Sequence, residues 1–139
     1  MVAADFQTVI TNREDVVFRS ADTTAFVASH QWPDNAGHVL VVPNEHYENL
    51  YLLPIGLADP LQRTTQLIAR AIKLAFDCPG ISTRQHNEPA GGQDVWHYHV
   101  HVFPRYDEDG LYGAERRAVA AAERKSQAQM IRNALNALN

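Results

Sequence analysis

Residues 97–104 are His97-Tyr98-His99-Val100-His101-Val102-Phe103-Pro104, with a histidine at every second position. Successive side chains of a β-strand point to opposite faces of a sheet. A strand over residues 97–103 therefore places the three imidazoles on one face, about 6.6–6.8 Å apart. Tyr98, Val100 and Val102 then point to the core. A slip of one residue would reverse the two faces, so the pattern specifies the register of the strand.

Three imidazoles on one face are compatible with two kinds of chemistry. In the first, one imidazole attacks an electrophile such as phosphorus and forms a covalent intermediate. The other two then orient it and assist in proton transfer and charge stabilisation. In the second, the histidines bind a metal ion that activates water, and Asp94 is a nearby carboxylate that could join them. The alternation alone leaves both open.

The rest of the chain predicts an α+β fold with a mostly antiparallel sheet. Short runs rich in β-branched and aromatic residues predict strands at 16–19, 24–28, 38–42 and 81–86. Apolar residues at helical spacing predict a central helix over 60–77, with Asp59 as N-cap and Pro60 at the first helical position. Strands, helix, strands and a final helix follow one another, which is not the alternating order of a parallel sheet.

The segment 113–138 is rich in alanine and predicts a C-terminal helix. We expect its apolar face to comprise Val119, Ala122, Met130, Ala134 and Leu138. The segment is also rich in basic residues, namely Arg116, Arg117, Arg124, Lys125 and Arg132. We expect these to form a solvated face rather than an anion-binding site.

Length and composition indicate one globular domain over residues 1–139. A net charge of −4 argues against a general nucleic-acid coat and leaves room for a small anionic ligand. The single cysteine, Cys78, allows no intramolecular disulfide. Met1–Phe6 lack a basic start followed by an apolar run, so we expect no signal peptide. With no apolar run of membrane-spanning length, we expect no membrane as partner. The lone cysteine fits a reducing cytoplasm, so we expect a cytoplasmic protein, and the net charge predicts no nucleic-acid polymer as partner.

Two separated motifs resemble the histidine triad (HIT) superfamily of nucleotide hydrolases and transferases. The first is Asn87–Arg105, in which a Gly-rich turn and Gln93, four residues before the first histidine, precede the His-φ-His-φ-His-φ-φ pattern. The second is Gly37–Pro43, which matches the family's Gly-His-x-Leu-Val-x-Pro segment. Phe26 stands where the family usually has an aromatic residue. The resemblance covers about residues 15–105, the core that carries the motifs.

The resemblance implies a five-stranded antiparallel sheet, usually paired into a ten-stranded sheet in a homodimer. It also implies a mechanism without metal or cofactor, in which a histidine attacks the α-phosphate of a nucleotide. Carried over to this sequence, the implied catalytic residues are His99 as nucleophile, His97 and His101 beside the phosphate, and His38 as a supporting histidine. The implied phosphate contacts are Asn87, Gly92 and Gln93, and Phe26 is the implied nucleoside contact.

The expected enzyme is a nucleotide phosphoramidase or dinucleoside polyphosphate hydrolase that acts through a nucleotidyl-histidine. Two positions depart from the family pattern. Asp94 stands where members often have Ser or Thr, and an acid there would repel a phosphate unless it is protonated, turned away or paired. Ala28 and Ser29 stand where many members have an acidic ribose ligand. These departures keep a non-catalytic nucleotide-binding module as an alternative. A metal-dependent hydrolase that uses the same histidines is a second alternative.

Overall fold

The computed structural model describes residues 12–139. The signal-peptide prediction concerns Met1–Phe6, which lie outside the described residues. One antiparallel sheet has the strand order β1-β2-β4-β6-β5. The strands are β1 Val16–Arg19, β2 Thr23–Val27, β4 Val39–Pro43, β5 Gly80–Arg84 and β6 Val100–Arg105. The predicted α+β fold with a five-stranded antiparallel sheet is confirmed.

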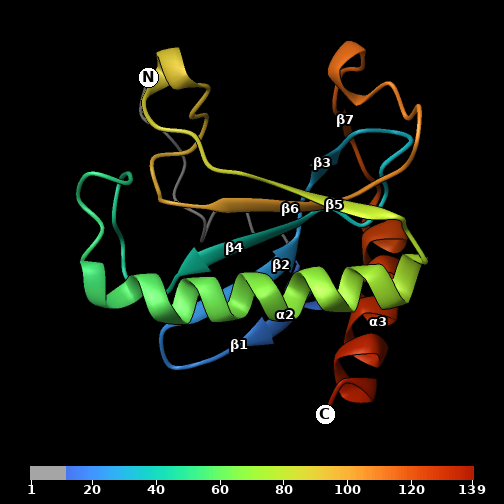
Figure 1. The fold of residues 1–139 in the computed structure, drawn as a ribbon, viewed down its shortest axis with the longest axis horizontal. Helices are drawn as coiled ribbons and strands as arrows, with labels where there is room; N and C mark the ends of the chain where they lie inside the picture. The colour runs from blue at the N-terminus through green and yellow to red at the C-terminus, as the bar shows by residue number, and fades with distance from the viewer. Residues whose placement is uncertain (1–11) are drawn as a thin grey trace.

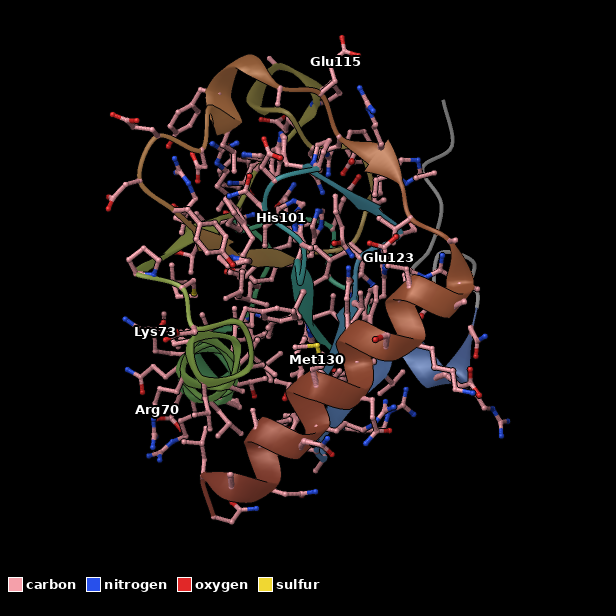
Figure 2. The ribbon with its side chains drawn as sticks, turned by 90° about the vertical axis from the view of Figure 1, so that its right-hand side faces the viewer. Arg70, Lys73, His101, Glu115, Glu123 and Met130 are labelled. Carbon is pink, nitrogen blue, oxygen red and sulfur yellow. The ribbon has the colours of Figure 1, made fainter. Side chains whose placement is uncertain are left out.

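Two helices cover one face of this sheet (Figures 1 and 2). Helix α2 (Ala58–Phe76) packs on β4 and β6, and α3 (Ala121–Ala137) packs on β1, β2 and α2. The core between the sheet and the helices includes Val39, Val41 and Val102 from the sheet, Ile68 from α2 and Ile131 from α3, all fully buried. Among residues 12–139, no α-helix packs on the opposite face of the sheet, which carries the histidines.

Helix α2 begins two residues before the predicted start. Leu57 is the N-cap residue, and Asp59 lies within the first turn, where it pairs with Arg63 at 2.7 Å. Predicted and observed helix ends commonly differ by this amount. The helix ends at Phe76, and Asp77 takes a left-handed conformation with φ 49°.

The predicted strand over residues 97–103 is displaced in the structure. Strand β6 begins at Val100 and continues through Pro104 to Arg105. Before it, the Tyr98 amide donates to the Tyr47 carbonyl, so residues 97–99 follow the loop after β4 rather than a neighbouring strand. The predicted alternation still holds, because His97, His99 and His101 are all buried on one side and Val102 lies in the opposite core.

The prediction for segment 113–138 is wrong in two respects. Residues 117–118 form a short strand, β7 (Arg117–Ala118), which pairs with β3 (His30–Gln31). The Val119 amide also donates to the Ser29 carbonyl, so this segment is extended and α3 starts only at Ala121. The buried face of α3 is also different: it consists of Arg124, Gln127, Ala128, Ile131, Ala134 and Leu135. Of the predicted face, Ala134 is buried and Leu138 packs against the core, whereas Ala122 and Met130 are exposed and Val119 precedes the helix.

The basic residues of this segment are not all on a solvated face. The Arg124 guanidinium is buried and donates to both carboxylate oxygens of Asp15, with Nε at 3.1 and 3.2 Å. Arg132 donates to the carbonyl oxygen of Val16 at 2.9 Å and so ties α3 to β1. These contacts set the rotation of α3, and this explains why the alanine positions did not predict its face.

Candidate active site

The sheet face that carries the histidines contains a cleft of about 660 Å³. Its lining includes His99 and His101, Asp94 from the preceding loop, and Ala28 and Leu40 from the sheet face and its rim. The remaining lining residues are Ser29, His30, Trp32, Val95, Ala114, Glu115 and Arg116. Figure 2 shows Glu115 at the end of the molecule opposite the two helices. The cleft therefore brings the predicted histidine cluster together with residues from the C-terminal segment.

The His99 imidazole has a defined orientation. Its Nδ1 lies 2.8 Å from the carbonyl oxygen of His97. A carbonyl oxygen can only accept a hydrogen bond, so Nδ1 carries the proton. In the neutral ring, the lone pair is then on Nε2, the atom that faces Asp94 Oδ1 at 3.6 Å. This arrangement presents a nucleophilic nitrogen to the cleft.

His97 does not line the cleft. Its Nε2 donates to the carbonyl oxygen of Pro43 at 2.9 Å. Its Nδ1 is 3.3 Å from Nδ1 of His46, an exposed residue that the sequence left without a catalytic role. His97 therefore fixes the backbone whose carbonyl orients His99.

His38 and His101 form a buried pair in which His38 Nε2 lies 2.9 Å from His101 Nδ1. Burial lowers the pKa of both residues well below the ordinary value, and the nearby positive charge of Arg116 lowers both further. Both rings are therefore neutral near pH 7. Within the described chain, His38 Nδ1 has no hydrogen-bond partner.

The buried Nδ1 of His38 indicates which ring donates. A buried acceptor without a partner is less costly than a buried donor without one. The proton of His38 is therefore best placed on Nε2, from which it is donated to His101 Nδ1. His101 then carries its own proton on Nε2, so its ring offers a hydrogen-bond donor beside His99.

The predicted phosphate loop is held by hydrogen bonds of the Gln93 and Asn87 side chains to neighbouring backbone groups. The Gln93 side chain accepts from the Glu88 amide at 2.7 Å and donates to the Val95 carbonyl at 3.0 Å. Asn87 Oδ1 accepts from the Leu50 amide at 2.8 Å. Neither side chain lines the cleft, and their phosphate contacts stay a prediction.

Gly92 is required by the shape of this loop. Its φ of +92° lies in the region that favours glycine, and an added Cβ would lie 3.4 Å from the His86 ring. The ring of His86 in turn lies 5.6 Å from that of His101. The positive φ at Gly92 therefore shapes this loop beside His86, and the contact of Gly92 with phosphate stays a prediction.

Phe26 lies beneath the cleft rather than in its lining. Its side chain is 1% exposed and packs with Ala28, Leu40 and Val42. Ala28 and Leu40 line the cleft above it. The nucleoside contact of Phe26 stays a prediction, and the packing indicates that Phe26 supports the surface a nucleoside would touch.

Asp94, the departure from the family pattern, is paired. Its Oδ1 faces His99, and its Oδ2 is 3.3 Å from Arg116 Nη2. A hydrogen bond from the protonated form of His99, together with the charge of Arg116, holds the pKa of this carboxyl well below its usual range. Asp94 is therefore an anion. From the sequence, this acid could be protonated, turned away or paired, and in the structure it is paired.

Trp32 and Arg116 line the cleft, although neither of them was assigned to the site from the sequence. Trp32 stacks on His38 with ring centroids 5.4 Å apart and planes at 4°. The Arg116 guanidinium lies 5.6 Å from the centre of the Trp32 ring, within cation–π range. The only sequence signal for Arg116 was the excess of basic residues after residue 114. We expected those residues to form the solvated face of a helix, so Arg116 was not assigned to the site.

Two further properties concern residues 12–139. None of the helices in that range is long and apolar enough to cross a membrane. In the same range, no group of three or more His, Cys, Asp or Glu side chains is arranged to hold a metal ion.

The fold and the four clustered histidines define a protein of the histidine triad class. The HIT domain family model matches residues 10–108. The chain belongs to this family.

Individual relatives agree with the family assignment. The chain is 41% identical over 78 residues to the protein called hit from Bacillus subtilis, covering 56% of this chain and 54% of that protein. It is 36% identical over 94 residues to a bis(5'-adenosyl)-triphosphatase of Saccharomyces cerevisiae, covering 67% of this chain and 45% of that enzyme. The matches thus span about half the length of these curated relatives. A solved HIT-like protein from Bartonella henselae, described as involved in cell-cycle regulation, has a TM-score of 0.75 and 32% identity, covering 86% of this chain and 85% of that one.

Proposed function

We propose that this chain, as a single HIT domain over residues 1–139, is a nucleotide hydrolase or transferase that acts through a nucleotidyl-histidine on His99. The observation that carries the proposal is the hydrogen bond from His99 Nδ1 to the His97 carbonyl, which leaves Nε2 facing the cleft. The name of the yeast relative, a bis(5'-adenosyl)-triphosphatase, supports a substrate in which a leaving group is joined to a nucleotide α-phosphate.

The proposed reaction has two displacement steps at phosphorus. His99 Nε2 attacks the α-phosphorus, so the N–P bond forms, and the bond to the leaving group breaks. The leaving group departs with that electron pair and takes up a proton. Water then attacks the same phosphorus, the N–P bond breaks with its electrons returning to Nε2, and the proton of the water is released.

The other histidines support these steps in different ways. His101 offers its Nε2–H to a phosphate oxygen or to the leaving group, because its Nδ1 is engaged by His38. His97 positions His99 through its backbone carbonyl. We assign His97 and His38 as positioning residues of the reaction.

We propose an adenosine phosphoramidate or a dinucleoside polyphosphate as substrate. The test is AMP release from each compound with chelator present, for the wild type and for His99→Asn. Asparagine retains a side-chain donor for the His97 carbonyl but has no nucleophilic nitrogen. We expect turnover of at least one compound by the wild type, and a loss of at least about 10⁴-fold in the variant.

The same experiment distinguishes the two alternatives. Binding of AMP without turnover of either compound would favour the non-catalytic binding module. Turnover that chelator abolishes and that added metal restores would favour the metal-dependent hydrolase. The free, buried Cys78 suits a reducing compartment, and we propose a cytoplasmic location, which cell fractionation would test.

We also propose a homodimer. Strand β5 is at one end of the strand order, so one of its edges is not paired within the described sheet. Beside it lies a groove lined by Ile55, Leu61, Thr83 and Tyr98, and Ile55 is 90% exposed. A second copy could pair its own β5 edge and cover this groove, giving a continuous ten-stranded sheet.

Light scattering tests the dimer. We expect twice the chain mass for the wild type and the monomer mass for Ile55→Asp. The matched control is Leu74→Asp, since Leu74 is 54% exposed on α2 but does not line the groove. A wild-type mass equal to one chain would contradict the dimer.

A further inference from the structure

Two short contacts link three polar side chains that line the cleft. Arg116 Nη2 is 3.3 Å from Asp94 Oδ2, and Asp94 Oδ1 is 3.6 Å from His99 Nε2. The carboxylate therefore bridges the guanidinium and the proposed nucleophile. Its side chain is 50% exposed and that of Arg116 is 34% exposed, so both can be reached from the cleft.

Arg116 comes from a segment that the fold holds over the site. We call residues 114–118 the strap. The pairing of β7 with β3 fixes its C-terminal end, and Val119 extends this pairing to Ser29. Ala114, Glu115 and Arg116 all line the cleft. Backbone pairing therefore brings the strap to the cleft, and there the Arg116 guanidinium pairs with Asp94.

Asp94 occupies the position that a substrate phosphate requires. An attacked phosphorus must come to about 3–3.5 Å from the nucleophilic nitrogen. The carboxylate oxygen is already 3.6 Å from His99 Nε2. A phosphate and this carboxylate cannot hold the same place, and two anions in contact repel each other. Substrate binding therefore requires Asp94 to move away.

Arg116, the partner that Asp94 would release, is suited to binding phosphate. A guanidinium can give two parallel hydrogen bonds to a phosphate group, a geometry that an ammonium group cannot reproduce. In this arrangement the carboxylate acts as a substitute anion that holds Arg116 in place until substrate arrives.

We propose that Arg116 is a substrate-binding residue that contacts the phosphate, and that Asp94 is an internal competitor which that phosphate displaces. The inference rests on the proposed function and adds a residue from the strap to the site. The inference explains why an acid, Asp94, lies beside His99, a nucleophile that must contact an anionic phosphate. It also predicts that Asp94 weakens the binding of product, which favours release of AMP after each turnover.

Binding of two probes, AMP and inorganic phosphate, tests this by calorimetry. The variants are Asp94→Asn, Arg116→Gln and, as matched control, Arg117→Gln. Arg117 is the next residue of the strap, is exposed and does not line the cleft. We expect Asp94→Asn to tighten AMP binding, Arg116→Gln to weaken it at least about tenfold, and Arg117→Gln to change it less than about twofold.

Hydrolysis measured in parallel separates this inference from the proposed function. If the AMP affinities of the wild type and the variants follow the expected order but the wild type turns over no substrate, the inference stands and the proposed hydrolysis fails. If Arg116→Gln binds AMP as the wild type does, or Asp94→Asn binds it more weakly, the inference is overturned. Absence of AMP and phosphate binding in both the wild type and Asp94→Asn would also overturn it.

Discussion

The buried pair of His38 and His101 predicts a specific loss of stability on mild acidification. Burial lowers the pKa of His38 from 6.5 to about 3, and it lowers the pKa of His101 in the same direction. Between pH 7 and pH 5 an unfolded histidine becomes almost fully protonated, whereas these two stay neutral in the folded protein. The unfolded state then binds more protons, so the free energy of unfolding falls as the pH is lowered.

The size of this loss follows from the two pKa values. For a histidine that titrates at 6.5 when unfolded and does not titrate above pH 5 when folded, the change from pH 7 to pH 5 is about 2 kcal/mol. The pair contributes about 4 kcal/mol. That is a large part of the stability of a typical domain of this size.

Urea denaturation at both pH values provides the assay, with wild type compared with His38→Asn. Because each protein is compared with itself at two pH values, any general loss of stability in the variant cancels. We expect the pH-dependent loss to be smaller by about 2 kcal/mol in His38→Asn. The control is Phe103→Leu, which alters packing against His38 but removes no titratable group. Equal pH dependence in wild type and His38→Asn would refute the reasoning, because the His38 ring would then not be held neutral.

Two further predictions concern the packing that supports the site. Arg124→Met leaves the buried Asp15 carboxylate without its guanidinium and should lower the free energy of unfolding by about 3 kcal/mol, with most of the loss recovered in Asp15→Leu/Arg124→Met; equal stabilities in urea denaturation would contradict this. Gly37→Ala should cost about 1–3 kcal/mol, because Gly37 has φ +103° and a Cβ there would lie 2.5 Å from the Phe76 ring. Gly56→Ala, which meets nothing within 4 Å, is the matched control, and thermal melting that shifts both variants equally would contradict the argument.

The sequence predicted the histidine cluster because its geometry is local. Residues two apart on an extended chain share a face whatever the rest of the fold does, so His97, His99 and His101 could be placed together. The strand itself was misplaced by three residues, since the start of β6 depends on pairing with β4 and β5. The predicted side-chain directions of the three histidines are therefore correct even though the predicted start of the strand is wrong.

The C-terminal residues could not be placed in the same way. Arg116 reaches the cleft only because β7 pairs with β3, a contact between segments that lie far apart in the chain. The rotation of α3 likewise depends on its ion pair with Asp15. An alanine-rich helix has little amphipathic contrast, so its own sequence could not reveal either contact.

The covalent intermediate is the central claim, and trapping it tests that claim most directly. Wild type and His99→Asn would be mixed with adenosine phosphoramidate, quenched in alkaline denaturant and digested for mass spectrometry. We predict an adenylyl group on the peptide that contains His99 in the wild type, and no modified peptide in the variant. AMP formation by the wild type with no adduct on His99, or an adduct on another histidine, would contradict the account.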